Sequence, residues 1–226
     1  MSTTKLQVGF KSLLKKALQS PIKKISLNTE PDYAAVSIVF QQAANQNLRF
    51  LMIRRAINDS DPWSGQMAFP GGKKESSDIN LDATVVRETR EEVGLDLLKT
   101  ADCFGRLDEI QGRTSGAKIP LIIAPYVYWI DETPEFILDP EEVHSTTWVN
   151  FSHCLKTESH RNHKIRFQDN DIDLPCIEHS PVPIWGISYL MLKNLTDLVF
   201  ALTDVGEFVK SLGGDYLQPW RPYPVH

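Results

Sequence analysis

The sequence has few cysteines and no long apolar run. Its three cysteines, Cys103, Cys154 and Cys176, lack the short paired spacings of a zinc site or a disulfide framework. This pattern favours a reducing, cytoplasmic compartment. No apolar stretch approaches the roughly 20 residues that cross a bilayer, so we expect no membrane span. Low-complexity tracts are also absent, and 42% hydrophobic with 23% charged residues is a composition typical of a folded globular protein.

Acidic residues are missing from the start of the chain. Six lysines precede the first acid, Glu30, so the remainder has 18 basic residues against 29 acidic ones and a net charge of −11. This balance argues against a nucleic-acid partner. Apolar residues recur at helical spacing between Phe10 and Leu18, which predicts a short amphipathic helix. We interpret residues 1–29 as a basic N-terminal extension whose helix docks on a domain of residues 30–226, with organellar targeting as the alternative.

Strand and helix patterns follow one another without regular alternation. Branched and aromatic residues predict strands at 34–40 and 48–53, joined by the polar hairpin 41–47. Further strands are expected at 103–107, 119–130, 146–150 and 164–167, helices at 81–93 and 184–200, and a polar hairpin turn at 169–173. This order favours an α/β sandwich with a mixed sheet over a doubly wound parallel sheet.

The most informative segment places three glutamates on one predicted helix. At about 100° per residue, Glu88, Glu91 and Glu92 share an arc of roughly 100°, and we expect all three to face outward. Like charges this close repel unless a cation neutralises them, and Mg²⁺ binds a few protein carboxylates together with substrate phosphates. The alternative is an exposed helix face whose acids are solvated or paired with Arg87 and Arg90.

Glycines flank this helix, with Phe69-Pro-Gly-Gly before it and Gly94 after it. Residues 72–95 resemble the signature box of the Nudix hydrolases, a pattern of Gly, a spacer, Glu, a second spacer and then Arg-Glu-apolar-x-Glu-Glu-x-Gly-apolar. The second half matches, with Thr89 in place of the usual aliphatic residue. The first half departs from the pattern, because Asp78 stands at the first Glu position and the spacer is one residue longer.

This variant is similar to the coenzyme A pyrophosphatase branch, which has a Phe-Pro-Gly-Gly entry and an Asp in the loop. Three further segments also resemble this branch: Gly65–Gly72, Pro140–Val143 and Ile184–Gly186. The resemblance therefore covers about residues 34–202. Two positions differ: Asp61 stands where that branch usually has Arg, and Ala56 stands where it has Ser.

The resemblance implies a Nudix-type α/β/α sandwich with a mixed β-sheet and a loop-helix-loop catalytic box. It also implies Mg²⁺-dependent hydrolysis of the diphosphate bond in a nucleoside-diphosphate-linked small molecule. The first candidate is coenzyme A or an acyl-coenzyme A, giving 3′,5′-ADP and a 4′-phosphopantetheine. The alternatives are ADP-ribose, NADH or another dinucleotide as substrate, and a Nudix module that senses a nucleotide without cleaving it. The protein is expected to act as a monomer or homodimer.

Site residues follow from the same resemblance. Mg²⁺ (or Mn²⁺) is expected on Glu88, Glu92, Glu91 and the carbonyl of Gly72. The catalytic candidates are Glu91, Glu88 and Glu142, and the general base stays open between Glu91 and the Glu141-Glu142 pair. Arg87 should hold a box carboxylate in position rather than touch substrate.

Substrate contacts are expected from Arg54, Arg55, Gly71 and Phe69. Each arginine ends a predicted strand and has the geometry for bidentate phosphate binding, although a solvated strand end is an equal alternative. The histidines show neither a two-His helical metal spacing nor a nucleophile partner, and we assign them no catalytic role.

Overall fold

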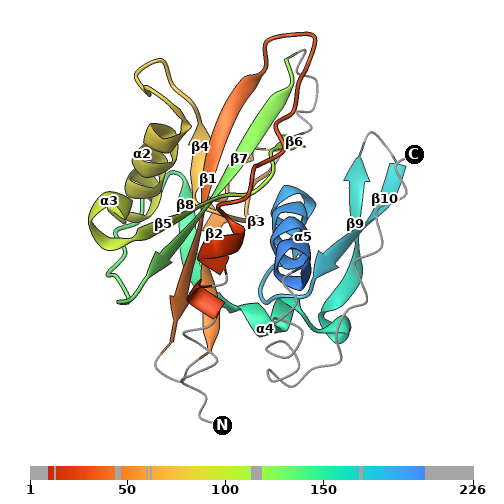
Figure 1. Ribbon diagram of the computed structural model, residues 1–226. Helices are drawn as coiled ribbons and strands as arrows, with labels where there is room; N and C mark the ends of the chain where they lie inside the picture. Colours follow the sequence, from red (N-terminus) through yellow and green to blue (C-terminus); the bar gives the residue numbers. More distant parts are fainter. Residues whose placement is uncertain are drawn as a thin grey trace.

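A mixed β-sheet forms the centre of the protein (Figure 1). The computed structural model describes residues 10–201, apart from residues 13, 44–46, 60, 62, 113–118 and 168–169. The strands of this sheet are β1 (Asp32–Gln42), β2 (Leu48–Arg55), β3 (Met67–Ala68), β4 (Gly71–Lys73), β5 (Asp102–Arg106), β6 (Ile110–Gly112), β7 (Leu121–Ile130) and β8 (Val143–Asn150). The order is β3-β2-β1-β7-β5, with β4 beside β1, β6 beside β7 and β8 beside β2. The pair β1 and β7 is parallel and β1 and β2 form an antiparallel hairpin, so the sheet is mixed.

A smaller sheet and several helices surround the central one. Its strands are β9 (His160–Phe167), β10 (Asn170–Ile177) and β11 (Ile184–Trp185), in the order β11-β10-β9. The helices are α2 (Leu81–Val93), α3 (Leu97–Thr100), α4 (Phe151–Cys154) and α5 (Gly186–Ala201), with a 3₁₀ turn at Thr157–Ser159. Residues 10–12 and 14–17 are also helical.

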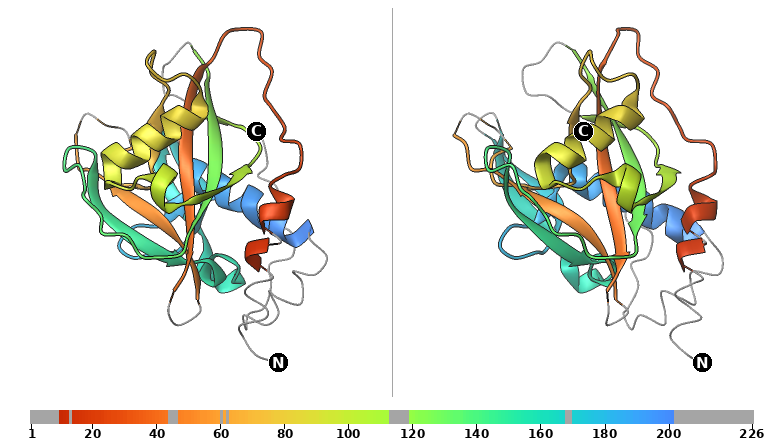
Figure 2. Two further views of the ribbon diagram at one scale, coloured as in Figure 1. Left: turned by 60° about the vertical axis from the view of Figure 1, so that its left-hand side comes forward. Right: turned by 90° about the vertical axis from the view of Figure 1, so that its left-hand side faces the viewer.

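Strand β1 shows how the sheet separates two cores. Its side chains alternate between the two faces, as the period of a strand requires. Ala35 and Val39 belong to the core under α2, whereas Ile38 and Phe40 belong to the core on the opposite face. Helices α2 and α3 cover the first face, and α5 with the N-terminal helix covers the second (Figures 1 and 2). The α/β/α sandwich with a mixed sheet is therefore confirmed.

The N-terminal helix packs on the same core as α5. Phe10 is 3% exposed, and its ring lies 6.4 Å from that of Phe40 and 5.9 Å from that of Phe151. Lys11 on its outer face binds Asp131 at 2.9 Å. The predicted helix is confirmed, and docking of its apolar face on its own domain is what the packing shows. A division of the chain at residue 30 stays a prediction.

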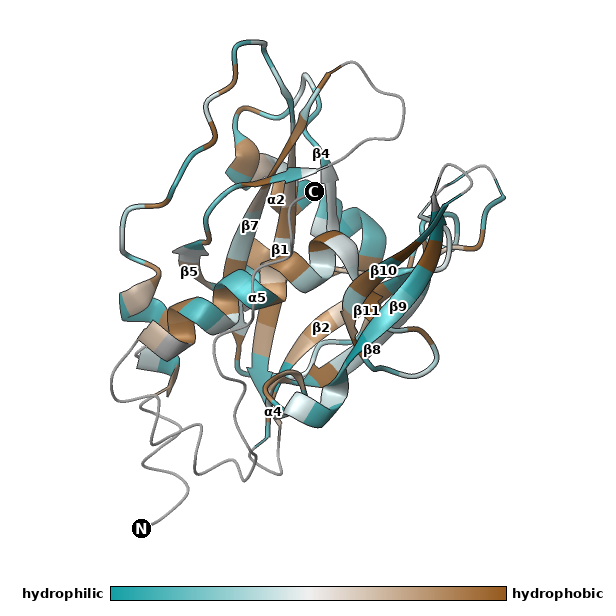
Figure 3. Cartoon of the chain, turned by 90° about the vertical axis from the view of Figure 1, so that its right-hand side faces the viewer, coloured by the Kyte–Doolittle hydropathy of each residue, from teal (hydrophilic) through white to brown (hydrophobic). Residues whose placement is uncertain are grey.

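Most expected elements are present, with two corrections at the C-terminal side. The predicted turn at 169–173 is wrong for residues 170–173, because the chain from Asn170 onward forms β10, paired with β9. Residue 169 lies outside the described part of the chain. The last helix begins at Gly186 rather than residue 184, because Ile184 and Trp185 form β11 (Figure 3). Among the helices described, none combines the length and apolar composition needed to cross a bilayer.

Candidate active site

Helix α2 is capped at both ends by residues of the box. The Asn80 side chain accepts a hydrogen bond from the Ala83 N–H at 2.8 Å. Gly94 adopts a φ of 72° and donates its N–H to the Arg90 carbonyl at 2.9 Å. A Cβ at Gly94 would lie 2.9 Å from Cβ of Ile137, so a side chain has no room here. These caps fix where the helix begins and ends, and therefore where its glutamates lie.

Arg87, in the middle of this helix, is the centre of an ion-pair network. Its Nε and Nη2 donate to the two carboxylate oxygens of Asp78 at 3.0 and 2.9 Å. Its Nη1 lies 2.8 Å from Oε2 of Glu91 and 3.0 Å from Oε1 of Glu88. Asp78 is buried, and the guanidinium beside it holds the pKa of its carboxyl well below the usual range. The prediction that Arg87 pairs with a box carboxylate is confirmed.

Glu88 and Glu92 lie against the Gly71-Gly72 backbone. The Gly71 N–H donates to Oε2 of Glu92 at 2.8 Å, and a Cβ at Gly72 would lie 2.5 Å from Oε2 of Glu88. Gly71 has a φ of 144°, which a side chain rarely tolerates. The expectation that all three glutamates face outward is wrong for Glu92, which is 1% exposed. The Glu88 side chain is 13% exposed and that of Glu91 is 52% exposed.

Burial and mutual repulsion act on the box carboxylates. Desolvation raises the pKa of Glu92 to about 8, and repulsion from Glu88 and Glu142 adds to it. Desolvation also raises the pKa of Glu88. The positive charge of Arg87 opposes this rise, whereas the negative charges of Glu142 and Glu91 add to it. Carboxylates that repel one another in a partly dry site favour a bound cation. Among the described residues, no group of three or more His, Cys, Asp or Glu is already arranged as a metal site, and Arg87 pairs with Glu88 and Glu91.

The loop before β8 brings Glu142 toward the box. The Ile137 and Asp139 N–H groups donate to the carbonyls of Val93 and Glu92 at the end of α2, both at 3.1 Å. This docking explains why Glu142 interacts electrostatically with Glu88 and Glu92. The neighbouring Glu141 is exposed, and its N–H donates to Oδ1 of Asp139 at 2.9 Å. The structure therefore associates Glu142 with the box carboxylates.

Both predicted phosphate-binding arginines are engaged by the loop that follows β2. Arg55 donates through Nη2 and Nε to Oδ2 of Asp61 at 2.7 and 3.1 Å. Arg54 donates to the Gly65 carbonyl at 3.2 Å. The charge of Arg55 opposes the rise that desolvation causes in the pKa of Glu92, so Arg55 interacts electrostatically with the box. The pairing of Asp61 with Arg55 had no signal in the sequence beyond the departure from the branch pattern.

Phe69 and Thr89 support the loop that carries Gly71. The Phe69 side chain is 3% exposed and its ring lies 5.8 Å from that of Phe50, so it is part of the core. Its role in substrate binding stays a prediction. The Thr89 hydroxyl donates to Oγ of Ser37 at 2.9 Å, and that hydroxyl donates to the Pro70 carbonyl at 3.3 Å. This buried chain explains a threonine where the pattern has an aliphatic residue.

A model described as the NUDIX domain matches residues 32–168, more than half of the chain, and the protein belongs to this family. The matched region contains the capped helix, the Gly71-Gly72 loop and Glu142.

The alignments with similar proteins cover only part of this chain and only part of each relative. The chain is 37% identical over 110 residues to an uncharacterized protein of Schizosaccharomyces pombe, covering 48% of this chain and 33% of that protein. It is 26% identical over 151 residues to the mitochondrial coenzyme A diphosphatase NUDT8 of Mus musculus, covering 66% of this chain and 67% of that protein. A MutT/nudix family protein from Enterococcus faecalis has a TM-score of 0.50 at 16% identity, over 88% of this chain and 75% of that chain. That likeness supports the fold alone.

Proposed function

We propose that this protein is a divalent-metal-dependent pyrophosphohydrolase that cleaves the diphosphate bond of a nucleoside-diphosphate-linked small molecule. The observation that carries the proposal is the placement of the Glu88 and Glu92 carboxylates against the Gly71-Gly72 backbone, with Glu92 only 1% exposed. Family membership supports the reaction class. Without a cation, burying the Glu92 carboxylate costs folding free energy, and the hydrogen bond from the Gly71 N–H offsets only part of that cost.

The donor set of the box fits Mg²⁺ or Mn²⁺. Both ions prefer oxygen ligands, which Glu88, Glu92 and Glu91 supply through carboxylates and Gly72 through its carbonyl. The absence of a side chain at Gly72 leaves space for the Glu88 carboxylate against the backbone. A bound ion would neutralise diphosphate oxygens and lower the pKa of a coordinated water.

The protein's own residues would position the reacting groups. Arg87, fixed by Asp78, holds Glu88 and Glu91 and limits their motion. Glu142 is the better candidate for general base, because Glu91 is tied to the Arg87 guanidinium, which weakens a carboxylate as a proton acceptor. Arg55 would bind a substrate phosphate once it parts from Asp61.

Coenzyme A or an acyl-coenzyme A is the first substrate candidate. The mouse relative is named a mitochondrial coenzyme A diphosphatase, and the Phe-Pro-Gly-Gly entry points the same way. Asp61 weakens this choice, because it adds a negative charge beside Arg55 where that branch usually has a positive one. ADP-ribose and NADH lack the 3′-phosphate of coenzyme A, and they remain alternatives together with other dinucleotides.

A substrate panel tests the proposal. The protein is incubated with Mg²⁺ and coenzyme A, acetyl-coenzyme A, ADP-ribose, NADH or a diadenosine polyphosphate, and the two phosphorylated products are separated by chromatography. The Glu92→Gln variant should lose activity, whereas Glu132→Gln, an exposed glutamate after β7, should keep it. Binding by calorimetry without product in Mg²⁺ and in Mn²⁺ would support the nucleotide-sensing module instead and overturn the proposal.

The compartment and the assembly also belong to the proposal. The cysteine pattern favours the cytoplasm, while the basic N-terminal helix and a mitochondrial relative favour an organelle. Imaging of fluorescent fusions with and without residues 1–29 would separate these alternatives. A monomer or homodimer, and the lack of a nucleic-acid partner, stay predictions.

A further inference from the structure

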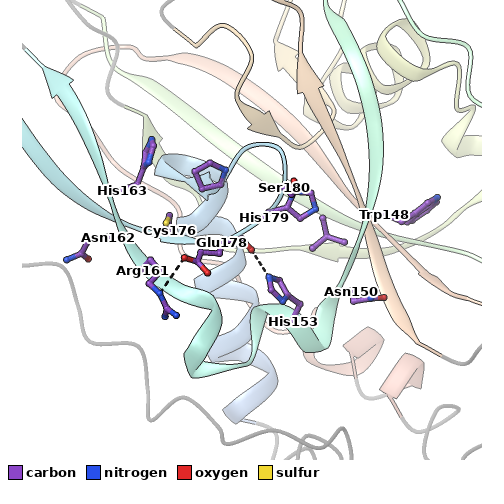
Figure 4. A pocket seen from close by; sticks show the side chains of 12 residues that line it. Trp148, Asn150, His153, Arg161, Asn162, His163, Cys176, Glu178, His179 and Ser180 are labelled. Carbon is purple, nitrogen blue, oxygen red and sulfur yellow. Dashed lines mark hydrogen bonds and ion pairs between the residues drawn. The ribbon is translucent and has the colours of Figure 1, made fainter.

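A groove of about 780 Å³ lies between the end of β8, α4 and the β9–β10 hairpin (Figure 4). We propose that this groove binds an organic phosphate of about mononucleotide size, at a second site separate from the Nudix box. Its polar lining carries three imidazoles, an arginine and two amides: His153, His163, His179, Arg161, Asn150 and Asn162. The spacing of these histidines in the sequence indicates no role in catalysis, and a separate binding site would give them a role in ligand binding.

The groove and the box lie at opposite ends of the β2–β8 pair. Asn150, which lines the groove, pairs with Arg49 at the start of β2. Arg55 beside the box pairs with Val143 at the other end of the two strands. Six residues of extended chain separate the two positions, which corresponds to roughly 20 Å. One small ligand therefore does not fill both places.

Arg161 offers most of its hydrogen-bonding capacity to the groove. Its Nη1 donates to the His160 carbonyl at 2.8 Å, and its Nε lies 3.4 Å from Oε1 of Glu178. The first bond orients the guanidinium, and three of its five N–H donors are left over. The Arg161 and Glu178 side chains are 51% and 58% exposed, and exposed pairs of this kind are weak. A phosphate can therefore displace Glu178 and bind the planar fork in bidentate fashion.

His179 gives the second, independent indication. Its Nδ1 is buried yet has no hydrogen-bond partner among the described residues, although the ring also interacts with the Val182 backbone. Buried polar atoms almost always have a partner, so this one is an exception that a ligand hydroxyl or phosphate oxygen would remove. The neighbouring His153 differs, because its two ring nitrogens already contact the Glu178 carbonyl at 2.6 Å and Ser159 Oγ at 3.1 Å. His153 therefore shapes the groove and His179 is left for the ligand.

The volume of the groove and the charges of its lining residues define the class of ligand. A volume of about 780 Å³ is within the range of small-molecule sites and far exceeds what a free phosphate ion fills. Val149 and Pro183 supply apolar wall for an organic body, whereas the Trp148 ring packs against Phe136 on the other face of β8. Glu178 is the one carboxylate in the lining, against an arginine and several neutral donors, so an anion fits better than a cation.

Titration calorimetry with AMP, inorganic phosphate and adenosine tests the proposal, with EDTA present so that no divalent metal assists the box. AMP should bind, phosphate should bind more weakly, and adenosine should show no heat. Arg161→Gln and His179→Phe should each weaken AMP binding at least about tenfold, which is about 1.4 kcal/mol. Lys164→Gln removes one charge from the same strand at an exposed position outside the groove and should change nothing.

Three results would overturn the second site. They are no binding of AMP at millimolar concentration, adenosine binding as tight as that of AMP, or AMP binding that survives both groove variants and disappears in Arg55→Gln. Circular dichroism of each variant checks that the fold is intact. Because no turnover is measured, failure here leaves the proposed hydrolase activity untouched, and failure of that activity leaves this result untouched.

Discussion

Replacing Asp78 with Asn removes the charge opposite Arg87 while keeping the size of the side chain. Asp78 is 6% exposed and receives two guanidinium hydrogen bonds, at 3.0 and 2.9 Å. Breaking a buried ion pair costs ~3–5 kcal/mol when the remaining charge has no other partner. Here Arg87 still has Glu88 and Glu91, at 3.0 and 2.8 Å, so we expect a loss of about 2–4 kcal/mol.

Urea unfolding followed by circular dichroism measures this loss. The midpoint should fall while the slope of free energy against urea stays constant, because the same surface is exposed on unfolding. Glu91→Gln serves as the matched control on the same guanidinium, since its carboxylate is 52% exposed and should cost less than about 1 kcal/mol. Equal effects of the two variants would refute the view that Asp78 anchors Arg87.

The pH dependence supplies an independent check with a definite sign. The pKa of Asp78 is lowered in the folded protein by its hydrogen bonds to Arg87, relative to about 3.9 in an unfolded chain. Its contribution is therefore fully present above the unfolded pKa and is lost as pH falls below about 4. The stability difference between the wild type and Asp78→Asn should be constant at neutral pH and shrink in acid. A difference that grows in acid would contradict the assignment.

Three further predictions concern the box loop, the metal and the N-terminal helix. Gly71→Ala should destabilise the protein by more than about 2 kcal/mol, because its Cβ would lie 2.5 Å from Cα of Val36. A melting temperature within about 2 °C of that of the wild type would count against this prediction. Saturating Mg²⁺ should raise the melting temperature of the wild type and not of Glu92→Gln, and an equal rise in both would remove Glu92 from the metal site. Phe10→Ala should lower the free energy of unfolding in urea by about 3–5 kcal/mol, because Phe10 is 3% exposed in the core. A loss below about 1 kcal/mol would show that the helix is dispensable for stability.

Local signals explain which parts of the fold were predictable. Helix α2 matches its expected bounds because an Asn cap, an apolar face and a terminal glycine all agree on them. Strands β3, β4 and β6 have two or three residues each, too few for a period of two to appear. The start of β10 reads as a turn because alternating Asp171 and Asp173 look like loop residues, although both are exposed side chains of a strand that pairs with β9.

The burial and the ion-pair partners of the site residues could not be predicted from local sequence signals either. The spacing of Glu88, Glu91 and Glu92 identifies one helical arc, but which member of that arc is buried depends on β1 and β4. The partner of Arg55 is likewise set by a loop that returns to the strand, so Asp61 could not be paired with it from spacing alone. Residues close in sequence were therefore predictable as a group, and their individual burial was not.

The most informative experiment compares turnover in two glutamate variants at saturating Mg²⁺ on whichever diphosphate the wild type cleaves fastest. Replacing a residue that only hydrogen-bonds a metal ligand typically lowers activity about 10- to 100-fold. Replacing a metal ligand itself should cost more, so Glu92→Gln should lower kcat at least about 100-fold. Glu132→Gln, an exposed control, should stay within about twofold of the wild type. Turnover by Glu92→Gln equal to that of Glu132→Gln would contradict a metal-dependent hydrolase built on the α2 carboxylates.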